Sequence, residues 1–458
     1  MLNKRFIEYF RDNFFENKGE ELEQFLASLE QSIPRTIRIK PGKVEQVRKN
    51  LEWDGWILTP TKIERVFSMD RREDFDPLER RLGFSSDHLV GNFYIQELAA
   101  AHPVDIIANS QIDPEPFLIL DMASSPGGKT TQLAEYYPNS FIIANEPTRE
   151  RLPQLLQNLE RMWSANIGIS LYPGQLYRHH SELFDRVLLD APCSGEWTLF
   201  KGTDAVKHWH LKNIKEIARL QTKLLDAGLH TLKVGGKMIY STCSLNLLEN
   251  EWVIDAMKAK YGDAFEVIFQ KKFWPHIDGT GGFFVAKIYK TRSLGIEEES
   301  NNPETEWYQE KRESKSKFQI TNNKELRVYR GNISPWNLQE WAVLYEHENK
   351  ILAVRNTDTW DRIRDKIFLM RYGEQIGVVE HGRFTPGNRA WRHLDTRELE
   401  IYTLQDAGEL NKYLRWELIA SKGIEQYLLV IYDSQILGLE YRKWDIISNT
   451  FSHEWRRK

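Results

Sequence analysis

The stretch FLILDMASSPGGKTTQLAEYY (Phe117–Tyr137) decides the fold of this chain. It opens with an apolar run that predicts a buried strand, passes through a turn of small residues, and continues as a predicted helix from Lys129. Small residues in such a turn let the backbone approach a ligand, and the first turn of the helix offers free N–H groups. The stretch therefore predicts a ligand site at the point where the strand ends.

The pattern of strand, turn and helix repeats through the middle of the chain. Further strands are expected at 141–146, 169–173, 185–190 and 237–244, with helical segments up to about 163 and from about 211 to 232. FEVIF and FFVAKIY complete the set of strands. Apolar strands that alternate with helices predict a parallel, doubly wound α/β sheet, which binds ligands beyond the carboxyl ends of its strands.

The composition indicates a globular protein of a reducing compartment. Two cysteines in 458 residues argue against a disulfide framework, so free thiols and a cytoplasmic location are expected. No window approaches 18 consecutive apolar residues and the first residues lack the apolar run of a secretory signal, so no membrane association is expected. The net charge of -4 does not indicate a polyanion partner, although local basic patches can still bind one.

Shifts in composition predict four parts of the chain. Residues 1–105, with helical segments and a strand near 34–41, form an accessory α+β domain, and residues 106–292 form the α/β core. Residues 293–322 are polar and charged and read as a linker. Residues 323–458, rich in aromatic residues and punctuated by glycine, predict a separate α+β domain.

The loop DMASSPGGKT resembles a phosphate-binding P-loop but departs from it. Gly128, Lys129 and Thr130 match G-x-x-x-x-G-K-T, whereas Ala123 replaces the first glycine and Pro126 removes an N–H group. A nucleotide hydrolase would use VLLD as its Mg²⁺-binding strand and would leave the cysteines without a role.

Glu146 favours a cofactor that contains adenosine. It closes the second strand, 25 residues after Asp121, where an acidic side chain can hold ribose hydroxyl groups. Glu146 and the small-residue loop together fit an adenosine-containing cofactor better than they fit the phosphate site of a nucleotide hydrolase.

Both cysteines follow predicted strands. LLDAPCSGE places Asp190 and Cys193 just beyond the fourth strand, and YSTCSLNLLENE places Cys243 at the end of the fifth. If these strands are neighbours, the two thiols and the carboxylate converge at one edge of the sheet. A metal site is not expected, because two thiols and one aspartate at this separation lack a ligand-spacing pattern.

With these motifs the chain resembles the Sun/Fmu family of RNA 5-methylcytosine methyltransferases, and specifically its YebU-type ribosomal RNA branch. The resemblance covers roughly residues 30–290, and its motifs are MASSPGGKT, ANEPTRERL, DAPCSGE, STCSLNLLENE and WPHIDGTGGFFVAKI. GRFTPGNRAW, KYLRWELI and YLLVIYDSQILGLEYRKW resemble a PUA-type RNA-binding module. The implied fold is a Rossmann-like class I methyltransferase sheet between a small N-terminal α+β domain and a C-terminal PUA-like α+β/β-barrel domain. The resemblance implies that residues 106–292 are the S-adenosylmethionine-dependent methyltransferase core, and that the accessory domain 1–105 and the PUA-like domain 323–458 bind RNA.

The resemblance also implies S-adenosylmethionine as cofactor and a role for each site residue. Cys243 would be the nucleophile, Cys193 would assist product release, and Asp190 would lie near the transferred methyl group and contact both cofactor and base. Glu146 would bind the ribose hydroxyl groups. The methionine part of the cofactor would be wrapped by Ala123, Ser124, Ser125, Pro126, Gly127, Gly128 and Lys129.

Two positions depart from the family pattern. Pro173 stands where the family often has an acidic residue near the adenine, so backbone groups or Gln175 would have to recognise that ring. Trp197 follows PCSGE where a small residue is usual, and it could narrow the base pocket or stack on a base.

The family favours small-subunit ribosomal RNA as partner, either naked or within a ribosomal subunit, with transfer RNA as the alternative. Two other readings stay open: a DNA enzyme that uses Cys193 as nucleophile, and a non-catalytic RNA-binding assembly factor, which Pro173 keeps open. The candidate RNA contacts are Arg35, Arg38, Lys40, Arg383, Arg389, Arg392 and the terminal RRK.

Overall fold

The computed structural model describes most of the chain up to residue 295 and a smaller share beyond it. The described residues are 3–74, 82–196, 209–295, 319–320, 343–347, 349–354, 363, 366–367, 369–381, 383–392, 397, 399–415, 417–432 and 435–448. Trp197, the side chain of Arg383, the terminal RRK and most of the expected linker lie outside this description.

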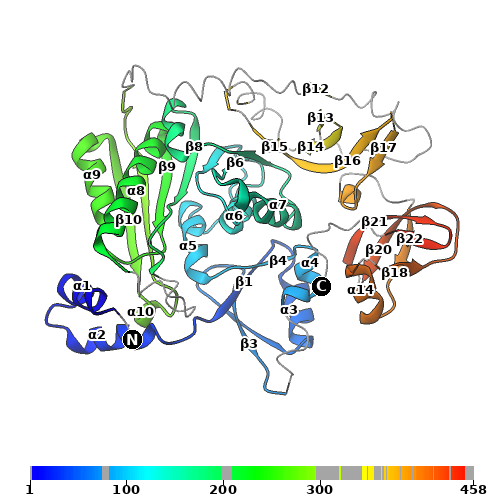
Figure 1. Cartoon of the computed structure of the whole chain (residues 1–458), viewed down its shortest axis with the longest axis horizontal. Helices are drawn as coiled ribbons and strands as arrows, with labels where there is room; N and C mark the ends of the chain where they lie inside the picture. The colour runs from blue at the N-terminus through cyan, green and yellow to red at the C-terminus, as the bar shows by residue number, and fades with distance from the viewer. Residues whose placement is uncertain are drawn as a thin grey trace.

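The central sheet of the fold has eight strands in the order β10-β11-β9-β8-β5-β6-β7-β15. Its strands β10, β9 and β8 can be followed at the left of Figure 1. The five strands from β9 to β7 are parallel, and the outer ones are antiparallel. The strands are β5 (Leu118–Asp121), β6 (Phe141–Asn145), β7 (Ile167–Ser170), β8 (Phe184–Asp190), β9 (Leu232–Thr242), β10 (Phe265–Phe273), β11 (Phe283–Lys290) and β15 (Arg371–Tyr372). The predicted Rossmann-like α/β fold is confirmed.

Helices cover both faces of this sheet because successive residues of a strand point to opposite faces. Leu118 and Leu120 of β5 pack with the apolar residues of α8 and α9, whereas Ile119 packs with those of α5, α6 and α7. These helices are α5 (Leu98–Ile107), α6 (Gly128–Tyr136), α7 (Leu152–Arg161), α8 (Leu211–Thr231) and α9 (Glu251–Tyr261). Short turns of helix lie at η2 (Arg149–Arg151), η3 (Gly174–His179), η6 (Gly262–Ala264) and α10 (Pro275–Asp278).

The N-terminal region has two parts that pack in different places. A four-stranded sheet, ordered β2-β3-β1-β4, lies beside α6 and α7, whereas helices α1 and α2 pack on Trp209, Leu245 and Leu248 near the end of β9. The elements are α1 (Lys4–Phe14), α2 (Gly19–Ser28), β1 (Arg35–Ile39), α3 (Val44–Trp53), β2 (Trp56–Pro60), β3 (Val66–Arg71), η1 (Leu82–Phe84), α4 (Ser86–Leu89) and β4 (Phe93–Ile95).

The C-terminal region contains two five-stranded sheets, ordered β12-β13-β14-β16-β17 and β18-β20-β21-β22-β19. It also contributes β15 to the central sheet, where Arg371 pairs with Ile169 of β7. The remaining elements are β12 (Gln319–Ile320), β13 (Val343–His347), β14 (Lys350–Val354), β16 (Glu374–Glu380), β17 (Arg383–Pro386), η7 (Ala390–Arg392), β18 (Glu400–Thr403), α14 (Ala407–Leu414), β19 (Ile419–Ala420), β20 (Gln426–Tyr432), β21 (Gln435–Lys443) and β22 (Ile446–Ser448). The C-terminal region thus contains the separate sheets that the sequence predicts. The likeness of this region to a PUA module and the predicted bounds of the four parts of the chain stay predictions.

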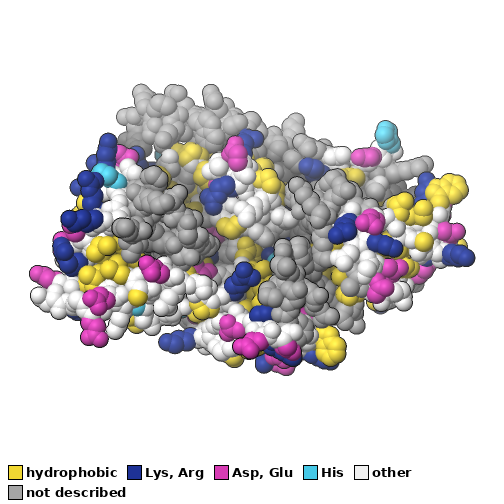
Figure 2. Space-filling model, turned by 60° about the horizontal axis from the view of Figure 1, so that its bottom comes forward, with side chains coloured by type: hydrophobic (Ala, Val, Ile, Leu, Met, Phe, Trp, Pro, Cys, Tyr) yellow, Lys and Arg dark blue, Asp and Glu magenta, His cyan; other side chains and the backbone are white. Residues whose placement is uncertain are grey.

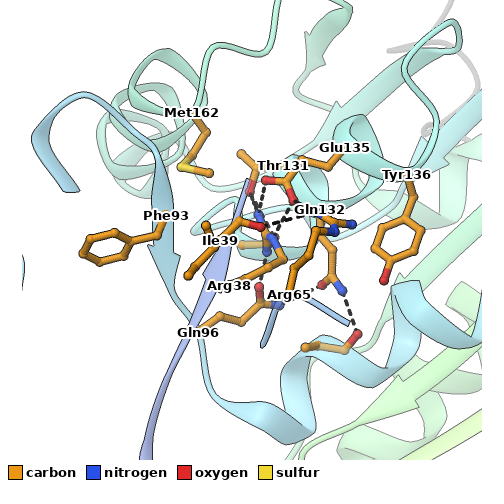
Figure 3. A network of polar contacts seen from close by, with 12 residues as sticks. Arg38, Ile39, Arg65, Phe93, Gln96, Thr131, Gln132, Glu135, Tyr136 and Met162 are labelled. Carbon is orange, nitrogen blue, oxygen red and sulfur yellow. Dashed lines mark hydrogen bonds and ion pairs between the residues drawn. The ribbon is translucent and has the colours of Figure 1, made fainter. Parts of the chain in front are cut away.

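Arg38 is buried between the N-terminal sheet and α6, so the prediction that it binds RNA is wrong (Figure 3). Its guanidinium forms two 3.0 Å bonds to the carboxylate of Glu135 and a 2.9 Å bond to the carbonyl of Gly128. Arg65 reaches the same carboxylate at 3.3 Å. Arg38 and Lys40 alternate with Ile37 and Ile39 in the sequence, which is typical of a strand with one exposed face, but α6 covers the face that carries Arg38. Arg38 therefore joins the N-terminal sheet to the helix that begins at the small-residue loop.

Replacing Arg38 with alanine is expected to lower the free energy of unfolding by about 3 kcal/mol, because Glu135 stays buried with one charged partner fewer. Urea denaturation followed by tryptophan fluorescence measures the change. Arg35→Ala is the matched control, since Arg35 is exposed on the same strand, and should change stability by about 0.5 kcal/mol or less. Equal losses in the two variants would contradict the role given to Arg38.

Three other predicted RNA contacts are half-buried and have partners within the protein. Lys40 places its ammonium 4.7 Å from the ring centre of Trp163, and burial lowers its pKa to about 7. Arg392 lies over the same ring at 4.3 Å, and Arg389 pairs with Glu160 of α7 at 3.0 Å. Arg389 and Arg392 join the C-terminal region to the core, and Lys40 joins the N-terminal sheet to it. Arg35 remains exposed.

Candidate active site

The small-residue loop between β5 and α6 packs closely against side chains of α7 and β4. Gly127 has a φ of +103°, and a Cβ at this position would lie 3.2 Å from the Leu155 side chain. A Cβ on Gly128 would lie 3.2 Å from the ring of Tyr94, which comes from β4. Both positions favour glycine, Gly127 for its backbone conformation and Gly128 for its close neighbour. The loop thus keeps one side against protein and the other side toward the strand ends.

Two buried carboxylates at the strand ends each carry an oxygen without a hydrogen-bond partner among the described residues. Asp121 accepts a 2.6 Å bond from Thr130 through Oδ2, its Oδ1 has no partner, and burial raises its pKa to about 7. Glu146 accepts from the Thr148 amide at 2.9 Å, while its Oε2 has only an ion pair with Arg151 at 3.3 Å. Such oxygens fit a ligand with hydroxyl and ammonium donors, as S-adenosylmethionine has.

The third strand ends differently from the prediction. β7 covers Ile167–Ser170, so Pro173 lies beyond the strand, just before η3, and both Pro173 and Gln175 are half-buried. Asn145 fixes this region by accepting from the Tyr172 amide and donating to the Tyr172 carbonyl, each at 2.9 Å. Recognition of adenine by Gln175 or by backbone groups stays a prediction.

Cys193 and Cys243 meet at the ends of neighbouring parallel strands. Asp190 of β8 pairs with Ser241 of β9, which brings the segments that follow these strands together. The structure joins the two cysteines in a disulfide with Cα atoms 6.4 Å apart, a normal spacing for such a bond. Free thiols were expected, so this is a correction, whereas the convergence follows from the neighbouring strands. Both residues are half-buried, and Cys243 packs against one of the two core clusters of the sheet.

Asp190 connects the loop to the cysteine-bearing strand end. Its Oδ2 accepts from the Lys129 ammonium at 2.8 Å, and its Oδ1 accepts from the Ser241 hydroxyl at 2.8 Å. The Asp190 side chain is 30% exposed, enough for a ligand to reach it. Lys129 therefore contacts a predicted catalytic group rather than open solvent.

No group of histidine, cysteine, aspartate or glutamate within the described part of the chain could hold a metal ion. Across the same residues, none of the helices has the length and apolar character that crossing a bilayer requires.

A parallel sheet with a small-residue loop after its first strand and buried, incompletely bonded carboxylates at two strand ends is typical of class I methyltransferases. The family model for the 16S rRNA methyltransferase RsmB/F matches residues 110–289. The chain is also 30% identical to the ribosomal RNA small subunit methyltransferase F of Aliivibrio fischeri, over 92% of this chain and 91% of that protein. The chain belongs to this RsmB/F family, and it is an S-adenosylmethionine-dependent RNA methyltransferase.

Other relatives agree with this assignment. The ribosomal RNA small subunit methyltransferase F of Aeromonas hydrophila is 34% identical over 60% of this chain and 61% of that protein. A solved methyltransferase homologue from Pyrococcus horikoshii is 28% identical, with a TM-score of 0.54 over 63% of this chain and 95% of that one. The solved NSun6 of the same organism, at 21% identity and a TM-score of 0.54, shares the fold.

Proposed function

We propose that the enzyme methylates carbon 5 of a cytosine in small-subunit ribosomal RNA through a covalent adduct with Cys243. The observation that carries this proposal is the meeting of Cys243, Cys193 and Asp190 at the ends of β8 and β9. The name of the Aliivibrio relative supports the substrate.

The reaction needs a thiolate because carbon 5 of cytosine is a poor nucleophile within its aromatic ring. The Cys243 thiolate forms a bond to carbon 6, and the electrons of the ring double bond move to carbon 5, which becomes enamine-like. Carbon 5 then forms a bond to the electrophilic methyl group that S-adenosylmethionine supplies, as the bond between that methyl group and sulfur breaks and S-adenosylhomocysteine leaves. The proton on carbon 5 then leaves, and the bond between Cys243 and carbon 6 breaks as the double bond returns. The disulfide must be reduced for this chemistry, so the active form carries both thiols.

Asp190 and Cys193 support different steps in this proposal. Asp190, held by Ser241 and Lys129, would hydrogen-bond to the base and stabilise charge that develops on the ring. Cys193 would assist removal of the carbon 5 proton and release of Cys243, since its sulfur lies beside the nucleophile. Lys129 and Glu146, with residues 123–128, would hold the cofactor.

The RNA would contact basic surfaces outside the central sheet. Arg35 is exposed on β1, and the exposed face of α8 carries Lys212, Lys215, Arg219 and Lys223 alongside Glu216. Figure 2 shows Lys and Arg side chains gathered at the end of the molecule where α8 and α9 lie. Such cations bind phosphate groups without reading sequence. We also propose that the N-terminal and C-terminal regions bind RNA and that the enzyme acts in the cytoplasm.

Labelled S-adenosylmethionine tests the substrate. Reduced enzyme is incubated with separate pools of 16S ribosomal RNA, assembled small subunits, transfer RNA and DNA, and the labelled nucleoside is identified. Label is expected as 5-methylcytosine in one of the two ribosomal pools. Label confined to transfer RNA or DNA would overturn the substrate, and label in none of the four pools would favour the non-catalytic alternative.

A further inference from the structure

We propose that Glu196 and Glu249 are positioning residues that fix the two cysteine-bearing loops to each other and so set the separation of the two sulfur atoms. The Cys193 loop is residues 191–196, and the Cys243 loop is residues 243–250. Each loop sends one glutamate into the other. The inference rests on the proposed function, because the separation matters for catalysis only if both cysteines act on one base.

Glu196 reaches from the Cys193 loop into the Cys243 loop. Its Oε2 accepts from the amides of Leu245 and Asn246 at 2.8 and 3.2 Å. Its Oε1 accepts from the Asn246 side-chain amide at 2.9 Å and from the indole N–H of Trp209 at 2.8 Å. Three of its four bonds therefore cross to the segment that immediately follows Cys243.

Glu249 makes the reciprocal connection. Its Oε2 accepts from the Ser194 amide at 2.8 Å, and its Oε1 accepts from the Ser194 hydroxyl. Two further donors complete its environment, the side-chain amides of Asn246 at 2.7 Å and Gln221 at 2.9 Å. Ser194 is the neighbour of Cys193, so this carboxylate holds the backbone that carries the sulfur.

Both carboxylates are buried, and neither forms an ion pair with a cation among the residues that the structure describes. A buried carboxylate is costly unless donors replace its water, and four hydrogen bonds do so for each. If the two loops moved apart, each carboxylate would lose its donors in the other loop. Water could replace these donors only by entering the buried space between the loops. The two glutamates thus resist separation of the loops more strongly than a surface pair would.

Small changes in the separation of the two sulfur atoms are expected to have large effects on the rate. A displacement of about 1 Å at reacting groups can lower a rate about 100-fold. Gln221 of α8 adds a fixed point, because it donates to both the Pro192 carbonyl at 2.8 Å and Glu249. The Tyr9 hydroxyl accepts from the Leu247 amide at 3.0 Å, which ties the Cys243 loop to α1 as well.

The test uses Glu249→Gln in the full chain. Glutamine keeps the size but has one acceptor oxygen, so at least one donor of Ser194 loses its partner. The first measurement is the rate at which reduced protein forms the Cys193–Cys243 disulfide when diamide takes up two electrons and the two thiol protons. We expect this rate to fall at least about tenfold. We also expect kcat to fall about 10- to 100-fold, with KM for RNA and Kd for S-adenosylmethionine within about twofold.

A second test variant, Ser194→Ala, and a control variant, Asp105→Asn, complete the experiment. Ser194→Ala removes one bond to Glu249 and retains the amide bond, so it should slow disulfide formation by a smaller factor even if Glu249→Gln folds poorly. Asp105→Asn is the matched control, because Asp105 is a buried carboxylate on α5 that binds Ser110 and Tyr136 and contacts neither cysteine loop. Its disulfide rate should equal that of the natural protein. Unchanged disulfide rates in both Glu249→Gln and Ser194→Ala would overturn the proposal, whereas failure of the reduced natural protein to form 5-methylcytosine in ribosomal RNA would overturn only the proposed function.

Discussion

Replacing Cys243 with alanine is expected to lower the rate of methyl transfer at least about 10³-fold, because the variant has no thiolate to add to carbon 6. Affinity for S-adenosylmethionine should change less than about twofold, since the proposed cofactor residues lie on the loop after β5 and at the end of β6. Single-turnover assays with labelled cofactor measure the rate, and calorimetry measures the affinity. Both are done with reductant present, so that the natural protein carries free thiols.

The Cys243→Ala variant keeps the thiol of Cys193, so its activity also shows whether Cys193 could be the nucleophile. If Cys193 were the nucleophile, as in the DNA-enzyme alternative, Cys243→Ala would retain substantial activity. Activity within about tenfold of the natural enzyme would therefore remove Cys243 from the mechanism and favour Cys193 in its place.

Replacing Cys193 with alanine is expected to trap a covalent complex between protein and RNA. The variant can still add Cys243 to the base and accept the methyl group, but it lacks the group proposed to help eliminate the enzyme. A band of higher mass should accumulate on a denaturing gel in the presence of RNA and S-adenosylmethionine. Turnover should fall by at least about 100-fold because each enzyme stays bound after one transfer.

The double variant Cys193→Ala/Cys243→Ala is the control for this trap, since it should form no adduct. A Cys193→Ala enzyme that turns over at the natural rate without a shifted band would deny Cys193 a role in release. An adduct that persists in the double variant would point to a different nucleophile.

The central sheet could be predicted because its strands have a simple signature. The strands that end at Asp121 and Asp190 are apolar on both faces, as a sheet covered by helices requires. β15 could not be predicted, because a strand of two residues has no periodicity and its pairing with β7 depends on a contact between segments far apart in the sequence. Arg38 was misjudged for a related reason: alternation shows that a strand has two faces, but not what covers the second one.

The candidate site was predictable where the topology alone brings residues together. Cys193 and Cys243 follow neighbouring parallel strands, and such strands end at one edge of the sheet. Asp121, Glu196 and Glu249 were missed as functional residues, although each is an acidic residue within a quoted motif. Glu196 could have been noticed because it lies in the turn that contains Cys193. Whether any of these carboxylates binds ligand, solvent or backbone depends on burial, which the sequence does not contain.

The nature of the adduct tests the central claim most directly. RNA carrying 5-fluorocytosine, in which fluorine replaces the proton that must leave, is incubated with reduced enzyme and S-adenosylmethionine, and the protein is digested for mass spectrometry. The predicted result is a methylated, fluorinated cytosine attached to the peptide that contains Cys243. Attachment to the Cys193 peptide, or the absence of any attached base from an enzyme that methylates ordinary RNA, would contradict the mechanism.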